Sequence, residues 1–274
     1  MPMLELASSP LAAGDPVTIA YRDVGEGAVV VFLHGGWGYD AYPVDSATMA
    51  NCRLVIPSRT GYGRSSPLDD LPADFHRLAM DETLAVLDAL GIDDAVWWGH
   101  SDGAVIAALA AIHAPARVRA AILEAVHFDP AKPASRGFFE RLVDDPDSFG
   151  ERIAGILARE HGARRWRRVL GANGRAWLDI AARAATLGDV YDGRLGYVTV
   201  PVLIVHGARA PRTAPGELEA VLAALPHAVV ALQPEGGHSP HSERRTAGAV
   251  MEAIAAFIAA LPADGHPVVT PRRR

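Results

Sequence analysis

The chain has 274 residues, half of them hydrophobic, and a formal net charge of −6 at pH 7. This length allows one large core, and the interspersed acidic and basic residues give no basic footprint for nucleic acid. A single cysteine, Cys52, excludes an intrachain disulfide. We see no leader-like start and no apolar stretch of membrane-spanning length, so we expect a cytoplasmic protein without membrane contact.

Short apolar runs, separated by helix-length segments, organise most of the chain. Residues 17–24 come first, and their near-alternation of apolar and polar residues predicts an antiparallel edge strand. Continuous apolar runs then predict buried strands at 29–33, 54–56, 95–98, 120–123, 200–205 and 228–232. Runs without polar alternation are typical of strands covered on both faces. We therefore predict an α/β fold with a mostly parallel open sheet and helices on both faces.

The interval 128–199 breaks this alternation of strand and helix. Helical patterns fill it around 135–143, 149–160 and 175–185. Such an interval is too ordered for a loop, so we expect an inserted helical cap, or lid, over the site. The core domain would then consist of residues 1–127 and 200–274.

Aromatic residues within the expected cap are candidates for the lining of a largely apolar pocket. They are Phe128, Phe138, Phe139 and Trp177. Some of them are equally explained by packing of the cap against the core. A dense basic cluster at 164–168 is expected to be a solvated helix face.

The motif Gly99-His100-Ser101-Asp102-Gly103 matches G-x-S-x-G, between the apolar run 95–98 and a small-residue helical pattern. A serine on such a tight strand-to-helix turn is held in strained geometry with its hydroxyl exposed, and the flanking glycines allow close packing. The N-terminus of the following helix directs free N–H groups at a developing oxyanion. The motif predicts Ser101 as a nucleophile, with a buried glycine turn as the alternative.

A serine nucleophile needs a base and an oxyanion hole. His238 is the preferred base because it follows the run 228–232 and two glycines, at the sheet edge where open α/β folds bind ligands. His241 is the rival. For the oxyanion we expect the backbone N–H of Asp102 and one from the glycine-rich loop after residue 33, with Gly36 preferred and Trp37 next. A plain tight turn is the alternative explanation of that loop.

Four motifs together resemble the α/β-hydrolase superfamily, in its G-x-S-x-G form with a helical cap. They are H-G-G-W-G at 34–38, P-S-R-T-G-Y-G-R-S at 57–65, G-H-S-D-G at 99–103 and G-G-H at 236–238. The resemblance covers about residues 15–261. Members commonly carry an Asp after the strand at 200–205 that orients the catalytic histidine, and Ala210 stands at that position here.

The missing acid leaves three interpretations open. In relatives such as haloalkane dehalogenases the acid comes from the end of the strand after the nucleophile helix, which is Glu124 in this chain. Glu124 is therefore the candidate acid. It could equally be a structural carboxylate under the cap, and Ala210 could mark a weakened dyad, natural or engineered.

These residues predict a serine hydrolase that cleaves a carboxylic ester, or an amide, of a small, largely apolar substrate through an acyl-enzyme. No cofactor or metal is implied, since no third clustered ligand joins His238 and His241. Two alternatives remain: a cofactor-free lyase or carbon–carbon bond hydrolase on the same fold, and a degenerate hydrolase acting as a small-molecule receptor. The substrate and the oligomeric state are open.

Overall fold

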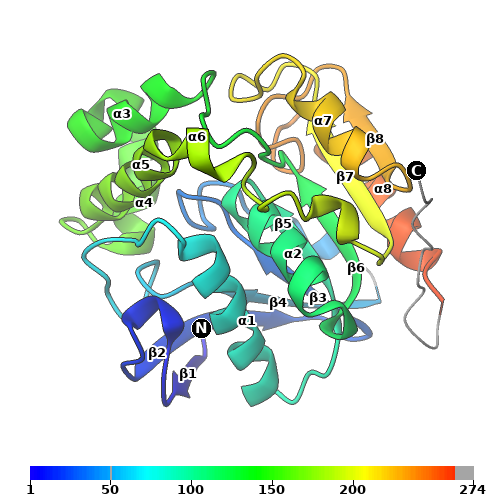
Figure 1. Cartoon of the computed structure of the whole chain (residues 1–274). Coiled ribbons are helices and arrows are strands. Elements are labelled where there is room, and N and C mark those ends of the chain that lie inside the picture. Colours follow the sequence, from blue (N-terminus) through cyan, green and yellow to red (C-terminus); the bar gives the residue numbers. More distant parts are fainter. Residues whose placement is uncertain (50, 263–274) are drawn as a thin grey trace.

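The computed structural model describes residues 1–49 and 51–262, and it is built on one twisted sheet of eight strands (Figure 1). The strands are β1 (Met3–Leu6), β2 (Val17–Val24), β3 (Ala28–Leu33), β4 (Cys52–Pro57), β5 (Ala95–His100), β6 (Val118–Glu124), β7 (Val202–Gly207) and β8 (Val229–Gln233). Their order is β1-β2-β4-β3-β5-β6-β7-β8, with β3 to β8 parallel and the β1–β2 and β2–β4 pairs antiparallel. The predicted fold class is confirmed.

From β4 onwards the helices alternate with the strands, except that four helices lie between β6 and β7. They are α1 (Phe75–Ala89), α2 (Asp102–His113), α3 (Arg136–Asp144), α4 (Glu151–His161), α5 (Trp166–Ala182), α6 (Ala184–Leu187), α7 (Glu217–Ala224) and α8 (Ala247–Ala259). No helix among the described residues is long and apolar enough to span a bilayer.

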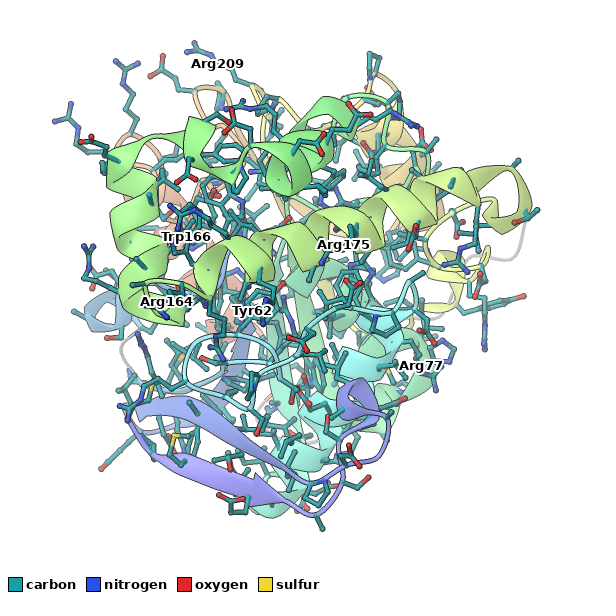
Figure 2. The ribbon with its side chains drawn as sticks, turned by 90° about the vertical axis from the view of Figure 1, so that its left-hand side faces the viewer. Tyr62, Arg77, Arg164, Trp166, Arg175 and Arg209 are labelled. Atoms are coloured by element: carbon teal, nitrogen blue, oxygen red, sulfur yellow. The ribbon has the colours of Figure 1, made fainter. Side chains whose placement is uncertain are left out.

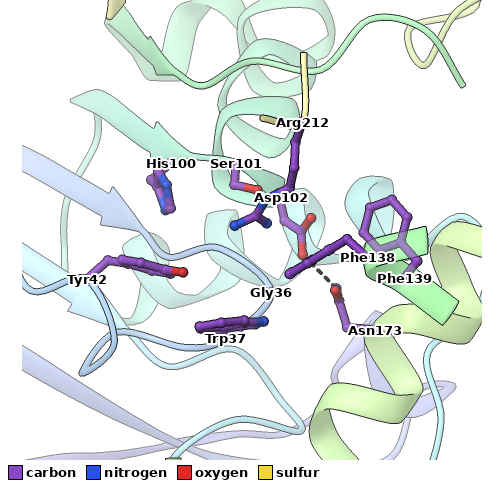
Figure 3. A pocket seen from close by; sticks show the side chains of 10 residues that line it. All are labelled: Gly36, Trp37, Tyr42, His100, Ser101, Asp102, Phe138, Phe139, Asn173 and Arg212. Carbon is purple, nitrogen blue, oxygen red and sulfur yellow. Dashed lines mark hydrogen bonds between the residues drawn. The ribbon is translucent and has the colours of Figure 1, made fainter. Parts of the chain in front are cut away.

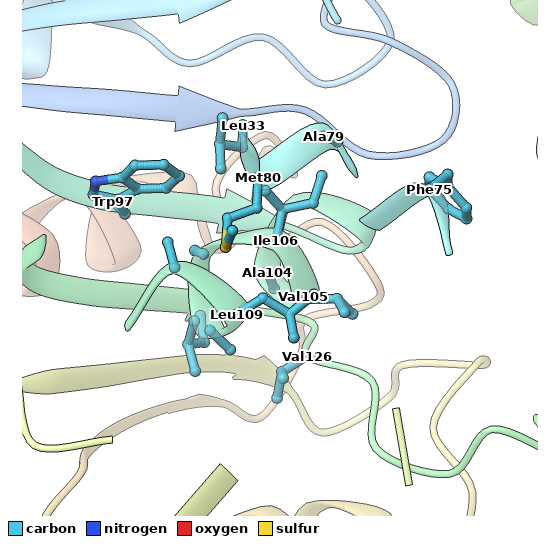
Figure 4. Close-up of a cluster of buried hydrophobic side chains, with 14 of the residues drawn as sticks. Leu33, Phe75, Ala79, Met80, Trp97, Ala104, Val105, Ile106, Leu109 and Val126 are labelled. Carbon is cyan, nitrogen blue, oxygen red and sulfur yellow. The ribbon is translucent and has the colours of Figure 1, made fainter. Parts of the chain in front are cut away.

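Both faces of the sheet are covered along β3 to β7, which explains the continuous apolar sequences of these strands. The run at 228–232, expected to be a buried strand, instead forms the edge strand β8, in which Val229, Val230 and Leu232 are exposed because no further strand of the described residues pairs beyond it. Alternate residues point to opposite faces of a strand. Trp97 accordingly packs in the core under α1 and α2, whereas Trp98 packs in a second core with Ile254 of α8. Figure 4 shows part of the first core, where Met80 of α1 lies beside Ile106 of α2 and near Leu33 of β3. Because α2 is buried on all sides, its sequence is apolar throughout rather than amphipathic.

Helices α3 to α6 occupy the chain between β6 and β7 and lie together over one end of the sheet (Figure 1). Residues 164–168 lie at the start of α5, where Arg164, Arg167 and Arg168 are exposed and Trp166 is buried. Figure 2 shows α5 crossing this face of the molecule with Arg164 and Trp166 near its beginning.

Two further expectations about elements need correction. Residues 17–24 form β2, which is not the edge of the sheet, because the short strand β1 pairs outside it. Helix α5 begins at Trp166 rather than near residue 175, since its first turns bury Val169 and Leu170. Of the expected core range 200–274, residues 263–274 lie outside the described part of the chain.

Candidate active site

Ser101 lies on the turn between β5 and α2, with φ 56° and ψ −117°. This is a conformation that non-glycine residues rarely adopt, and such strain persists only where surrounding structure enforces it. The Ser101 N–H donates to the carbonyl of Glu124 over 2.9 Å, which anchors the turn to β6. The strand, turn and helix expected around this serine are present. The side chain is not open to solvent, however, since only 4% of Ser101 is exposed beneath the α3–α6 segment.

Two glycines make this turn possible. A Cβ atom on Gly99 would lie 1.9 Å from the Gly103 carbonyl oxygen, and one on Gly103 would lie 1.9 Å from the carbonyl oxygen of Leu33. Both distances are shorter than any tolerated contact with backbone. The glycines of the motif therefore set how closely α2 approaches β3 and β5.

The Ser101 hydroxyl contacts His127, which lies three residues beyond the end of β6. Its Oγ is 3.2 Å from His127 Nε2. The His127 carbonyl accepts a hydrogen bond from the Tyr191 hydroxyl over 2.7 Å. The imidazole ring of His127 packs edge-on against the ring of Trp177. Burial, followed by the charge of Lys132, holds the pKa of His127 well below its usual value. His127 is thus a neutral ring whose Nε2 faces the serine hydroxyl, and sequence reasoning missed it.

His238, the expected base, lies beside this pair on the loop after β8. Its ring stacks on that of His127, with centroids 5.8 Å apart. Neither ring nitrogen of His238 has a hydrogen-bond partner in the structure, and the side chain is buried. Burial and then the charge of Arg212 hold the pKa of His238 well below its usual value. The ring is therefore neutral, with its lone pair unengaged.

Glu124 is bound to His241 and not to His238. The Glu124 carboxylate lies 2.8 Å from His241 Nδ1, and it accepts from the His241 backbone N–H and from Trp98 Nε1. A turn in which the Ser242 N–H donates to the Ser239 carbonyl follows His238 and brings the His241 N–H to Glu124 at the end of β6. The expected contact of Glu124 with His238 is therefore replaced by a buried Glu124–His241 pair.

His241 uses both ring nitrogens in this arrangement. Nδ1 faces the Glu124 carboxylate, and Nε2 lies 3.0 Å from the carbonyl oxygen of Tyr42. Burial opposes the charged ring, but the neighbouring Glu124 raises the pKa of His241 above its usual value. A ring that donates from both nitrogens has no lone pair left to accept a proton.

The loop after β3 brings the expected oxyanion donors to the same place. Gly36 and Trp37 line a small pocket together with Ser101 and Asp102 (Figure 3). Gly36 lies against Asn173 of α5, where a Cβ atom would come within 2.4 Å of the amide oxygen. A side chain at position 36 would therefore push this loop away from the pocket.

Four aromatic rings line the pocket, together with two charged side chains, Asp102 and Arg212. Its walls include Trp37, Tyr42, Phe138 and Phe139. Trp177 lies behind them, stacked on Phe139 with centroids 5.3 Å apart. Phe128 does not line this pocket, and its ring lies near Tyr191 instead.

Asp102 and Arg212 bring charge to this pocket. The Asp102 carboxylate accepts from Asn173 Nδ2 over 2.7 Å and from Trp177 Nε1 over 2.8 Å, and lies 3.9 Å from the buried Arg59 guanidinium. Burial opposes its ionisation, but hydrogen bonding and charge from His76, with Arg59, lower the pKa of Asp102. Arg212 follows β7 and reaches into the pocket with its guanidinium end (Figure 3).

Comparison with known proteins agrees with this architecture. Residues 30–253 match the alpha/beta hydrolase family. The chain is 26% identical over 242 residues to serine hydrolase BPHL of Mus musculus, covering 85% of this chain and 81% of that protein. It is 36% identical over 124 residues to epoxide hydrolase A of Mycobacterium tuberculosis, covering 39% and 38%.

A solved structure extends the likeness over nearly the whole chain. A thermophilic esterase from Thermogutta terrifontis superposes with a TM-score of 0.69 at 19% identity, covering 95% of this chain and 99% of that one. At this identity the likeness concerns the fold. With the match over residues 30–253 and the strand order described above, the chain belongs to the alpha/beta hydrolase family.

Proposed function

We propose that this protein is a serine hydrolase that cleaves a carboxylic ester, or an amide, through an acyl-enzyme on Ser101. One observation carries the proposal: a serine held at φ 56° on the turn before α2, with its hydroxyl 3.2 Å from a neutral histidine nitrogen. A nucleophile within hydrogen-bond reach of a base is the arrangement that activates a hydroxyl.

In the proposed reaction, the Ser101 proton passes to an imidazole as Oγ bonds to the substrate carbonyl carbon. The observed contact favours His127 as the first acceptor, and the stacked His238 is the second candidate base. The backbone N–H groups of Asp102 and of Gly36 or Trp37 would hold the oxyanion. The imidazolium then protonates the departing alcohol or amine, and water cleaves the acyl-serine with the same histidine as base.

The proposed site lacks the carboxylate that completes a triad. No hydrogen bond or ion pair among the described residues joins a carboxylate to His127 or His238. Glu124 is engaged by His241, and Ala210 offers only a methyl group. We therefore propose a weak hydrolase, because no carboxylate of the described residues is hydrogen-bonded to the imidazolium that forms. The same observation favours the second candidate function, a degenerate hydrolase that binds a small molecule without turnover.

The relatives include both serine and epoxide hydrolases, and the chemistry of Ser101 favours the former. A serine that opened an epoxide would form an ether, which water at this site cannot cleave. Attack on an ester carbonyl instead gives an acyl-serine that can be hydrolysed. The relative of Mus musculus that matches most of the chain is a serine hydrolase by name.

Labelling of the active serine tests the proposal. A fluorophosphonate probe should modify the wild-type protein at one residue, and Ser101→Ala should remove both labelling and the hydrolysis of 4-nitrophenyl esters. Thermal unfolding of the variant should match the wild type, since the hydroxyl supplies no core packing. An unlabelled wild-type protein would favour the receptor function, and equal ester turnover in Ser101→Ala would refute the nucleophile.

A further inference from the structure

Arg212 is the one charged group of the pocket that the described residues leave without an ionic partner. Asp102 forms an ion pair with Arg59, and Glu124 forms one with His241; both pairs are buried. Lys132, whose charge also acts on His127, lies 2.7 Å from Glu217. The ion pairs within residues 1–49 and 51–262 include none with Arg212. Arg212 therefore has no ion pair of its own among the described residues, and the Asp102 carboxylate, which is already paired with Arg59, acts on its charge only from beyond ion-pair distance.

The protein holds the Arg212 side chain in place by contacts that leave its charge unmatched. The guanidinium carbon lies 4.0 Å from the centre of the Phe138 ring of α3. The Ser135 hydroxyl donates to the Arg212 carbonyl over 3.0 Å, and the guanidinium and the Tyr42 hydroxyl line the same pocket, close enough for the Arg212 charge to act on the pKa of Tyr42. Ring and hydroxyl contacts fix the direction of the side chain but do not neutralise it. Arg212 is half-buried, and burial lowers its pKa. A partly desolvated cation without an ion pair is unfavourable, so its retention needs a reason.

We propose that Arg212 binds a carboxylate of the substrate, so that this hydrolase selects anionic esters. Arg212 and Ser101 line the same small pocket, so the carboxylate must lie only a few bonds from the scissile carbonyl. Half-esters of short dicarboxylic acids have this spacing. The planar guanidinium matches a carboxylate with two parallel hydrogen bonds. The inference rests on the proposed function and replaces the largely apolar substrate expected from the sequence with one that also carries an acid group.

A pair of substrates that differ only in charge tests the selection. We expect wild-type kcat/KM to be about 10- to 100-fold higher for mono-(4-nitrophenyl) glutarate than for its methyl ester. This ratio corresponds to the contribution of one charge-assisted hydrogen bond. Arg212→Met should abolish this preference, and Arg212→Lys should keep part of it. Arg209→Met is the matched control, because Arg209 lies on the same loop but is exposed beside Glu235 and points away from the molecule (Figure 2). It should preserve the preference.

Binding to a variant without the nucleophile separates failure of this inference from failure of the proposed function. In Ser101→Ala, calorimetry should show monomethyl glutarate binding about 10-fold or more tighter than dimethyl glutarate, and Arg212→Met in that background should remove the difference. This holds even if no ester is hydrolysed. Equal binding of the two ligands would overturn the inference, as would an Arg212→Met variant that loses activity equally on charged and neutral esters. The Arg212→Lys variant keeps the test decisive if Arg212→Met does not fold.

Discussion

Restoring a carboxylate after β7 should increase the activity of this protein. Ala210 follows β7 on a loop whose Arg209 N–H donates to the Gly236 carbonyl over 2.9 Å, two residues before His238. Asp in place of Ala210 would put a carboxylate beside the loop that carries His238. Since neither ring nitrogen of His238 has a partner, the ring is available to the new acceptor.

The size of the effect follows from the electrostatics of the site. A carboxylate about 4 Å from an imidazolium is worth at most about 4 kcal/mol at an effective dielectric constant of about 20. Loss of a triad acid in other enzymes costs roughly 10⁴-fold in kcat. Arg212, whose charge already lowers the pKa of His238, will attract part of the new carboxylate. We therefore expect a gain in kcat of about 100-fold, or about 2.7 kcal/mol at 1.36 kcal/mol per tenfold change.

The assay is steady-state hydrolysis of a 4-nitrophenyl ester between pH 6 and pH 9. Ala208→Asp is the matched control, since Ala208 is exposed on the same loop and adds the same charge. The gain should appear only in Ala210→Asp and should vanish when His238→Ala is added. An unchanged kcat, or an equal gain in Ala208→Asp, would refute the reasoning. So would a gain that survives His238→Ala and is lost only in His127→Ala, and that result would leave His127 as the base.

Three further predictions concern the supports of the site. Glu124→Gln should lower the free energy of unfolding in urea by about 3–5 kcal/mol because it removes the carboxylate that compensates for the burial of the His241 ring. A fully stable variant that has lost turnover would instead make Glu124 the acid. Glu160 of α4 accepts the Tyr39 and Asp40 N–H groups, and burial, with the charge of Asp40, raises the pKa of Glu160 from 4.5 to about 7. A carboxyl whose pKa is raised on folding contributes to stability while it is protonated, and this contribution is lost as the pH rises through the folded pKa. The free energy of unfolding of the wild type should therefore fall by on the order of 3 kcal/mol, relative to that of Glu160→Gln, as the pH rises from 4.5 to 7. Parallel curves of unfolding free energy against pH for the two proteins would contradict this. Gly103→Ala should destabilise by about 3 kcal/mol or more through the Leu33 carbonyl, whereas Gly155→Ala, whose Cβ would meet only Arg159 at 3.6 Å, should be neutral or stabilising, as thermal unfolding would show.

The local sequence determined the positions of strands and helices wherever burial of their side chains produces a recognisable pattern of apolar residues. Strands β3, β5 and β6 are covered on both faces, so their sequences are continuous apolar runs that identify them. Strand β1 has four residues with only Leu6 buried, and too few side chains face the core to produce a pattern. The start of α5 was missed because an arginine-rich segment surrounds its first buried residue, Trp166.

The same distinction applies to the site. Ser101 could be predicted because the backbone strain of its turn and the close approach of α2 require a particular local sequence, with glycines at 99 and 103. His127 and Arg212 lie on irregular loops that follow β6 and β7, where the sequence has no period to read. Their position after the carboxyl ends of neighbouring strands was the available signal.

Which histidine meets which acid was decided by the tertiary structure alone. His238 and His241 are three residues apart on one loop, and both were reasonable partners for Glu124. The path of the chain at residues 239–240 and the Tyr42 carbonyl together hold the ring of His241 at the end of β6. Loop paths depend on contacts between segments far apart in the sequence, so the identities of the residues could suggest the chemistry but not this pairing.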